Sequence, residues 1–350
     1  MAYTTINDPS AYFQTTIYTG NGGTQSITNT GNSDMQPDWT WIKRRDSADN
    51  HNTFDSVRGA THRLITNLTN AQDTVTNMLT SFNSDGFSVG SHEGVNGSSM
   101  TYASWNWKAG TSVSGNTGGS GTAKSYTGSV NTDAGFSIIA YTGNGTAGHT
   151  IPHHLSAVPN IVLTKGRSAA LNWFFFDSMS NYLKRLKLNT TDAQADTDGL
   201  NDTAPTSSVF TVSGGGEGNT NGTTYVAYLF SEKKGYSKFG SYTGNGNVDG
   251  PFIYTGFKPS FLLIKITNSA DSWRMWDNKR NTFNPMDITL RPNTTDGDYT
   301  ASANNIDFLS NGFKFRTTSG GYNGSGDTQI YMAFAENPFV TSSGVPACAR

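Results

Sequence analysis

Paired carboxylates would be the most informative chemistry in this sequence, because two facing carboxyl groups can hydrolyse a glycosidic bond. The chain has only four glutamates: Glu93, Glu217, Glu232 and Glu336. Three aspartates are the better candidates, since each follows an aromatic residue and lies eighteen residues beyond a proline: Asp55, Asp177 and Asp277. A carboxylate that recurs at one place in every copy of a repeat more often caps a loop or pairs with a neighbouring arginine. We therefore predict no catalytic residue and no enzymatic activity.

Three histidines, His149, His153 and His154, form the one cluster with the character of metal ligands. A zinc site also needs a nearby cysteine, histidine or carboxylate to complete its ligand set, and none accompanies them. The turns rich in Asp and Asn do not match the spacing of a twelve-residue calcium loop. We expect solvated histidines in a connecting loop, with no metal and no cofactor.

Tryptophans offer the last candidate chemistry, a platform on which sugar rings could stack. The seven are Trp39, Trp41, Trp105, Trp107, Trp173, Trp273 and Trp276. The alternation in Trp39-Thr40-Trp41 and in Trp105-Asn106-Trp107 puts both rings of each pair on one sheet face, as a core requires. We favour a core role, and the sequence locates no ligand site.

The elements that position these residues occur three times. Tyr-Thr-Gly-Asn-Gly stands at 18–22, 141–145 and 242–246. Each copy is followed by a proline with an apolar run, an Asn-x-Thr turn, a second apolar strand, an Asn-Gly pair and a closing strand that starts at Tyr102, Tyr225 or Tyr331. The pentapeptide predicts a strand that ends in a turn of positive φ, and Asn-Gly favours a tight hairpin. Without a secretory route, the Asn-x-Thr turns reflect turn chemistry rather than glycosylation.

Short strands separated by turn residues predict an all-β fold of three tandem antiparallel β-sandwich modules, each of about 100 residues. The predicted modules span residues 1–110, 126–235 and 236–341, with a C-terminal tail at 342–350. Residues 111–125 consist almost entirely of Gly, Ser, Thr and Ala, which predicts a flexible linker. We accordingly expect modules two and three to form a fixed pair, with module one on a longer lead.

Composition excludes several classes of protein. The net charge is −2 with no basic stripe, so nucleic-acid binding has little support. No apolar segment is long enough to cross a membrane, and residues 1–8 lack the features of a signal peptide. The single Cys348 cannot form an intrachain disulfide. Together these features predict synthesis in a cytoplasm without membrane insertion.

Three phrases carry a resemblance to a known family. They are the opening Tyr3-Thr4-Thr5-Ile6-Asn7-Asp8-Pro9-Ser10-Ala11-Tyr12-Phe13-Gln14, the segment Phe54-Asp55-Ser56-Val57-Arg58-Gly59, and the closing Tyr331-Met332-Ala333-Phe334-Ala335-Glu336-Asn337-Pro338-Phe339. They resemble structural proteins of cyanophages and other marine tailed bacteriophages, over essentially the whole chain. The resemblance implies tandem β-sandwiches of lectin-like or jelly-roll type carried on the virion, and it implies no catalytic residues.

We therefore expect a non-enzymatic virion protein on the particle exterior, either a capsid decoration or a short head or tail appendage. Its partners would be other capsid or tail proteins and, as a homo-oligomer, itself; three similar modules would present pseudo-threefold symmetry to a capsid site. The alternative is a tail-fibre, receptor-binding protein that recognises a host-surface glycan. A polysaccharide depolymerase ranks last, because the carboxylates are few.

Overall fold

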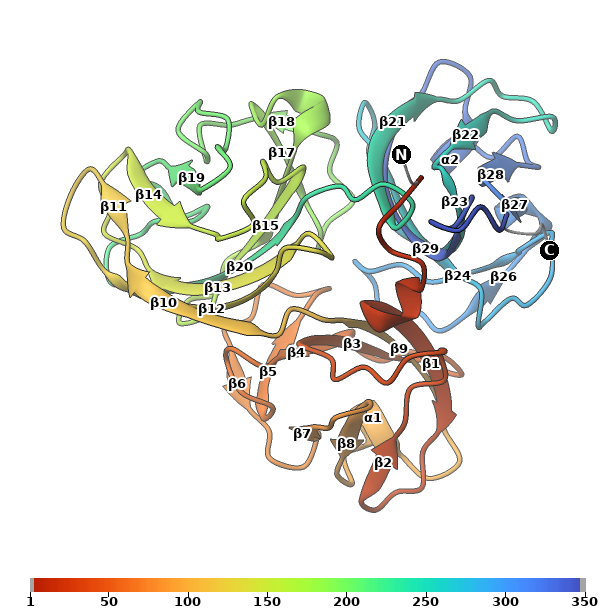
Figure 1. Ribbon diagram of the computed structural model, residues 1–350, viewed down its shortest axis with the longest axis horizontal. Helices are drawn as coiled ribbons and strands as arrows, with labels where there is room; N and C mark the ends of the chain where they lie inside the picture. The colour runs from red at the N-terminus through yellow and green to blue at the C-terminus, as the bar shows by residue number, and fades with distance from the viewer. Residues whose placement is uncertain (1–2, 347–350) are drawn as a thin grey trace.

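The computed structural model describes residues 3–346 and is built almost wholly of antiparallel strands, which confirms the all-β prediction. Figure 1 shows these strands gathered in three lobes around a common centre. Lobe 1 comprises residues 13–107, lobe 2 residues 111–230 and lobe 3 residues 237–338; within the described chain, each ladder of paired strands lies inside one lobe. Cys348 lies outside the described residues, as do residues 347–350 of the predicted tail. That each lobe is an independent module stays a prediction.

Lobe 1 packs a sheet of order β1-β9-β3-β4-β5-β6 against a smaller sheet of order β2-β8-β7. Its elements are η1 (Pro9–Ala11), which precedes the lobe, β1 (Phe13–Thr19), β2 (Gln25–Ile27), β3 (Trp39–Arg44), β4 (Asn52–Asp55), β5 (His62–Ile65), β6 (Asp73–Thr74), β7 (Leu79–Phe82), β8 (Phe87–Val89), α1 (Glu93–Asn96) and β9 (Thr101–Trp107). Ile27, Phe54 and Phe87 belong to the apolar core between the two sheets.

Lobe 2 has the largest sheet, of order β10-β12-β13-β20-β15-β16-β17-β18, and a second sheet of order β11-β14-β19. Its elements are β10 (Thr111–Asn116), β11 (Gly118–Gly119), β12 (Ser125–Asn131), β13 (Phe136–Thr142), β14 (His149–Pro152), β15 (Ile161–Gly166), β16 (Trp173–Asp177), η2 (Ser178–Ser180), β17 (Lys184–Lys187), β18 (Ala195–Asp196), β19 (Val209–Val212) and β20 (Thr224–Phe230). Ile139, Ile151 and Phe210 belong to its sandwich core.

Lobe 3 pairs a sheet of order β21-β29-β23-β24 with one of order β22-β28-β27, and adds the short ladder β25-β26. Its elements are β21 (Ser237–Thr243), β22 (Phe252–Tyr254), β23 (Phe257–Ile266), β24 (Arg274–Asp277), β25 (Ile288–Thr289), β26 (Tyr299–Thr300), η3 (Ser302–Asn304), β27 (Ile306–Leu309), β28 (Gly312–Phe315), α2 (Gly320–Asn323) and β29 (Thr328–Pro338). Ile253, Trp276 and Phe313 belong to its core.

A fourth apolar core lies at the centre, where the large sheets of all three lobes meet. Phe13 of lobe 1 stacks on Phe334 of lobe 3 with ring centroids 5.1 Å apart, and Phe230 of lobe 2 lies 5.8 Å from Phe334. These sheets are covered on both faces, so every residue of β23 is buried and the strand shows no alternation of polar and apolar residues. The interlobe core is one reason why aromatic residues are so frequent in this chain.

The prediction that the tryptophans belong to the core is confirmed, but the core in question is a different one. Trp39, Trp41, Trp105 and Trp107 are all at most 2% exposed, and they belong to the central core rather than to the core of a single sandwich. Trp39 stacks on Tyr228 of lobe 2 with ring centroids 4.4 Å apart. Their rings therefore join lobes, which explains why both members of each pair point the same way.

The flexible linker predicted at 111–125 is wrong. Residues 111–116 form β10, which pairs with β12 over six residues, and residues 118–119 form β11, which pairs with β14. The segment therefore adds strands to both sheets of lobe 2. Small residues had indicated flexibility, but they also let an edge strand lie flat, and the sheet edges supply its hydrogen bonds. Lobe 1 is accordingly not on a longer lead; it packs against both other lobes.

The N-terminal arm closes the ring of lobes. Thr4 Oγ1 donates to the Lys234 carbonyl oxygen at 2.6 Å, and the Tyr3 hydroxyl donates to the Gly256 carbonyl oxygen at 2.7 Å, so the arm lies on lobe 3 before the chain enters β1. Asn7 and Ser342 bond to each other twice, each time at 2.7 Å. The segments that carry Asn7 and Ser342 therefore lie side by side.

Strand register corrects two of the repeat landmarks. Lys43, Lys165 and Lys265 pair with Ala103, Val226 and Ile330, so the residue equivalent to Tyr102 and Tyr225 is Gln329, two before Tyr331. The expected Asn-Gly hairpins are also wrong in lobes 1 and 3. There the Asn ends a short helical turn, α1 or α2, and the glycine has a φ of −60°.

Candidate functional site

The three recurring aspartates end β4, β16 and β24, and all three are buried. Asp55 and Asp277 each lie at a contact between two lobes, which we call a joint. At the joint of lobes 1 and 2, Asp55 forms an ion pair with Arg58, and both side chains are fully buried. The Tyr228 hydroxyl of lobe 2 donates to Asp55 Oδ2 at 2.6 Å. The carboxylate therefore anchors one lobe to the next, as the pairing expected from sequence suggests.

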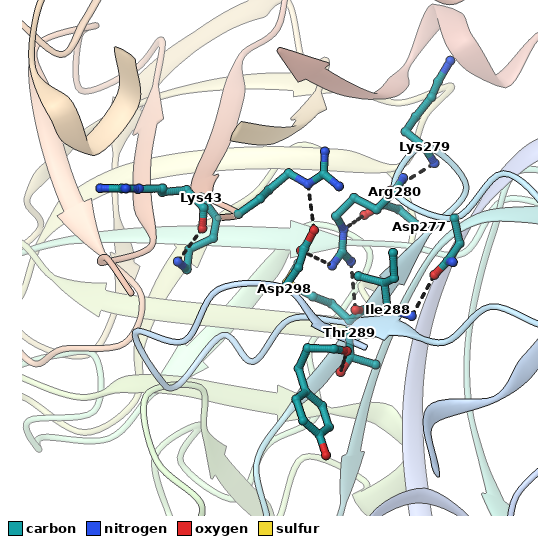
Figure 2. Close-up of polar contacts among 12 residues, drawn as sticks. Lys43, Asp277, Lys279, Arg280, Ile288, Thr289 and Asp298 are labelled. Carbon is teal, nitrogen blue, oxygen red and sulfur yellow. Dashed lines mark hydrogen bonds and ion pairs between the residues drawn. The ribbon is translucent and has the colours of Figure 1, made fainter. Parts of the chain in front are cut away.

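Asp277 repeats this arrangement at the joint of lobes 3 and 1. Arg280 Nε donates to Asp277 Oδ2 at 2.6 Å, and Trp105 Nε1 of lobe 1 reaches the same oxygen at 3.1 Å. Figure 2 shows Arg280 between two carboxylates, because Asp298 Oδ1 accepts from it at 3.1 Å. Arg45 of lobe 1 donates to the other oxygen of Asp298 at 2.8 Å. This buried network needs both lobes to satisfy its charges.

Asp177 departs from the pattern, because Ser180 stands where the other lobes have an arginine. Its carboxylate accepts from the Ser180 N–H at 2.9 Å and from Gln194 Nε2 at 3.1 Å. Burial without a cation raises the pKa of Asp177 to about 6, against the lowering effect of its hydrogen bonds with Ser180 and Met179. The Asp177 side chain is enclosed, with no exposed surface.

A second recurring residue, the lysine six positions after each landmark proline, lies at the joints too. Lys165 Nζ donates to the Thr69 carbonyl oxygen of lobe 1 at 2.8 Å, and Lys265 Nζ reaches the Thr191 carbonyl oxygen of lobe 2 at 3.3 Å. Both threonines close Asn-x-Thr turns. Lys43 bonds instead to its own lobe, at the Arg44 carbonyl oxygen (Figure 2). Burial lowers the pKa of Lys165 to about 7 and those of Lys43 and Lys265 to about 8.

Main-chain bonds show that the three joints follow one cyclic rule. Each lobe donates one main-chain N–H to a carbonyl oxygen of the next lobe. The bonds run from Gln72 of lobe 1 to Arg167 of lobe 2 at 2.8 Å, from Gln194 of lobe 2 to Thr267 of lobe 3 at 2.8 Å, and from Asp298 of lobe 3 to Arg45 of lobe 1 at 2.7 Å. Indole groups repeat two of these links: Trp173 Nε1 reaches the Ile65 oxygen at 2.8 Å and Trp273 Nε1 the Lys187 oxygen at 2.9 Å. The lobes therefore close into a ring with pseudo-threefold symmetry.

The pentapeptide is held by a buried asparagine in each lobe. The side-chain oxygens of Asn96, Asn219 and Asn323 accept from the main-chain N–H of the pentapeptide's own asparagine at 2.8 to 3.0 Å. The second glycine of the motif has φ between +65° and +74°, which confirms the predicted turn. In lobe 2 the holding residue is Asn219, two residues before the Asn-Gly pair Asn221-Gly222, whereas in lobes 1 and 3 it is the asparagine of that pair. The motif is a structural clasp, because the N–H groups of its two glycines also donate to main-chain oxygens of the same lobe.

The histidines are not a solvated loop cluster, because residues 149–152 form β14 and both His149 and His153 are buried. His149 bonds to Asn219 Oδ1 at 2.9 Å and to Thr117 Oγ1 at 2.6 Å. His154 Nε2 lies 2.7 Å from the Tyr126 hydroxyl. Burial lowers the pKa of His149, and that of His153 to about 4. Each ring has a protein partner of its own, and within residues 3–346 no group of three or more potential ligands could hold a metal.

The glutamates are equally dispersed. Glu217 forms an ion pair with Arg185, Glu232 with Lys238 at 2.6 Å, and Glu336 with Lys258 at 3.5 Å. The main-chain oxygen of Glu93 accepts from the Tyr102 hydroxyl. Glu93 and Glu217 belong to lobes 1 and 2, whereas Glu232 and Glu336 pair with two different lysines of lobe 3.

An open cleft with a volume of about 400 Å³ lies between lobes 1 and 3 and is lined mainly by amides and hydroxyls. Its central Gln14 is already bonded at both ends, to the Ser10 and Ser33 carbonyl oxygens and to the Gly31 N–H. Lys279 Nζ reaches across to Thr30 Oγ1 at 3.3 Å. The cleft is therefore a seam between lobes whose central amide already has its hydrogen-bond partners. In the described chain, no helix is long and apolar enough to span a membrane.

Comparison with protein families adds one match, to a domain of unknown function, DUF7483, over residues 8–338. The chain belongs to the DUF7483 family. The match starts one residue before η1 and ends with β29, so the DUF7483 unit is the ring of three lobes and not a single lobe. No curated protein and no solved structure matches the chain. The residues that recur in this DUF7483 chain are the ones that build its joints and clasps.

Proposed function

We propose that this protein is a non-enzymatic structural component on the exterior of a bacteriophage particle, as a capsid decoration or a short head or tail appendage. One observation carries the proposal: the polar residues that recur in the three lobes bind within the protein itself, most of them at the joints and clasps of a closed ring. A protein whose repeated chemistry serves its own architecture is suited to a rigid structural role. The resemblance of its opening and closing phrases to marine phage structural proteins supplies the setting.

The geometry supports a capsid or tail partner of matching symmetry. Three lobes related by one cyclic rule would present three similar faces to a threefold position, or one face to a single copy of a partner. The surface carries little charge, since 14% of all residues are charged and several of those are buried in the joints. Contacts that depend little on exposed ion pairs are weakly screened by salt.

Purified particles test the proposal. An antibody against the folded protein should label intact virions, and an averaged image should show a three-lobed density on the outer surface. The control is an antibody against an internal head protein, which should label only broken particles. Absence of the protein from mature particles would refute the proposal.

The alternative, a receptor-binding protein that recognises a host-surface glycan, is favoured by one observation. The exposed aromatic residues of the described chain are confined to lobe 3. In such a protein the ring would be the scaffold and lobe 3 the part that meets the host.

A further inference from the structure

All four aromatic side chains that are largely exposed within residues 3–346 belong to lobe 3: Phe252, Tyr254, Phe283 and Tyr299. Lobes 1 and 2 contain many aromatic residues, and in the described chain theirs are buried or partly buried. An aromatic ring that stays exposed adds little hydrophobic stabilisation to the fold. Adjacent exposed rings are characteristic of a binding surface. Phe252 and Tyr254 are such a pair, since they lie two residues apart on β22.

The two rings share the outer face of the small sheet of lobe 3. Ile253 between them points into the sandwich core, while Phe252 is 45% and Tyr254 52% exposed. Residues two apart on a strand lie about 7 Å from each other, so both rings stand side by side over the sheet. The Tyr254 hydroxyl lies 3.1 Å from the Tyr3 hydroxyl, and Tyr3 is itself bonded to Gly256. The N-terminal arm thus fixes one edge of the pair.

Strand pairing identifies the matching positions in the other lobes. Ile27, Ile151 and Ile253 lie opposite Phe87, Phe210 and Phe313, so the three isoleucines are equivalent. The residues flanking them are Ser26 and Thr28 in lobe 1, Thr150 and Pro152 in lobe 2, and Phe252 and Tyr254 in lobe 3. The fold therefore does not require aromatic residues at these positions. Lobe 3 alone carries them.

Charged side chains stand beside the rings. Lys314 lies directly opposite Phe252, and Asp307 directly opposite Lys314, so the three form a row across the outer face. Lys314 Nζ lies 2.9 Å from Asp249 Oδ1, and Arg316 Nε lies 2.6 Å from Asp307 Oδ2. Asp249 is the most exposed of these groups, at 77% of its side chain. Lys314 Nζ also donates to the Gly250 carbonyl oxygen at 2.9 Å. The flat rings thus adjoin charged groups, of which the Asp249 carboxylate is largely accessible.

The area of the patch decides between kinds of partner. An aromatic side chain offers about 150–250 Å² of surface, so two half-exposed rings present about 200 Å² together. A stable protein complex buries about 800 Å² on each partner, which is several times more. The patch has the size of a small ligand with a flat apolar face and a polar rim. A pyranose ring has that form, with C–H groups on its faces and hydroxyls on its edge.

We propose that Phe252 and Tyr254 form a stacking platform for the pyranose rings of a saccharide, with Lys314 and Asp249 as hydrogen-bonding partners of its hydroxyls. The proposal is independent of the position of the protein on a particle. Failure to find the protein in virions would refute the structural role and leave this binding site untouched. Failure to bind saccharide would refute this binding site and leave the structural role untouched.

The test uses the full chain and a panel of soluble pyranose oligosaccharides of two to six rings, titrated to millimolar concentration by calorimetry or ligand-observed NMR. We expect at least one member to bind. Phe252→Ser with Tyr254→Thr, which installs the residues of lobe 1, should weaken that binding at least tenfold. Phe283→Ser is the matched control, since it removes an even more exposed ring of the same lobe and should leave binding unchanged.

A reverse exchange sharpens the test. Ser26→Phe with Thr28→Tyr, added to the double variant, should return part of the binding through lobe 1, because the strand geometry there is equivalent. Near-ultraviolet circular dichroism establishes that each variant is folded. Absence of binding by the unaltered chain to every oligosaccharide would overturn the proposal, as would equal binding by the double variant. Dissociation of an oligomer by the same substitutions would assign the face to contacts between copies and overturn it too.

Discussion

Replacing the buried carboxylate of Asp177 by an amide should stabilise the protein, whereas the same change at the equivalent Asp55 should destabilise it. Asp177 is buried without a cation, and its partner Gln194 can turn its amide to accept a hydrogen bond from an asparagine at this position. Asp55 instead balances the charge of the fully buried Arg58. The same substitution thus tests a buried carboxylate with an arginine partner and one without, because Ser180 stands after Asp177 where Arg58 stands after Asp55.

The magnitude follows from the pKa of Asp177, which burial raises from 3.8 to about 6. A raised pKa means that the folded state holds the proton more tightly than the unfolded state. The stability that this proton supplies is complete below pH 3.8 and is lost as the pH rises through 6. A difference of about 2 pKa units corresponds to about 3 kcal/mol at neutral pH. Asp177→Asn should recover up to that amount, while Asp55→Asn leaves a buried arginine unpaired and should cost about 3–5 kcal/mol.

Urea unfolding, followed by tryptophan fluorescence between pH 4 and pH 7, measures both effects. The difference in unfolding free energy between Asp177→Asn and the unaltered chain should be small at the acid end and grow towards neutral pH. For Asp55→Asn the loss should be present at neutral pH. If Asp177→Asn destabilises the protein at pH 7, or if its effect does not change with pH, the assignment of an unpaired buried carboxylate is wrong.

Three further substitutions test the joints and clasps. Lys165 has a folded-state pKa of about 7, below that of an unfolded lysine, so its contribution to stability should increase from pH 7 towards 10. Urea midpoints measured over this pH range should rise in the unaltered chain, and the rise should be absent in Lys165→Met. Asn323→Ala should lower the unfolding free energy by about 3 kcal/mol or more in the same assay, because several buried main-chain groups lose their partner. Gly244→Ala should lower the melting temperature in calorimetry, since its Cβ would lie 2.2 Å from the Gly324 carbonyl oxygen, whereas Gly320→Ala, with nothing within 4 Å, should not.

Local patterns in the sequence predicted the strands, the buried tryptophans and the turn of the pentapeptide. Each depends on neighbours within a few residues: alternation places the rings of Trp39 and Trp41 together, and a glycine after Asn accepts positive φ. The arginine partner of Asp55 was foreseeable for the same reason, since Arg58 lies one turn further along the chain.

What the sequence could not reveal depends on contacts between distant segments. The Gly-rich residues 111–119 look flexible until sheet edges are available to pair with them. His149 looks solvated until Asn219 and Thr117 are brought to either side of its ring. The cyclic order of the joints was likewise hidden, although the threefold recurrence of Lys43, Lys165 and Lys265 was its visible signal.

The closed ring has a consequence for how the lobes can diverge. Three separate chains of identical sequence could adopt the same cyclic arrangement, but any substitution would then appear three times. Here the three lobes are encoded in one chain whose ends meet at Asn7 and Ser342, so each lobe mutates by itself while the joints keep the assembly in register. Ser26, Thr150 and Phe252 show the result at one equivalent position. One chain with three lobes is thus a symmetric scaffold that can carry an asymmetric surface.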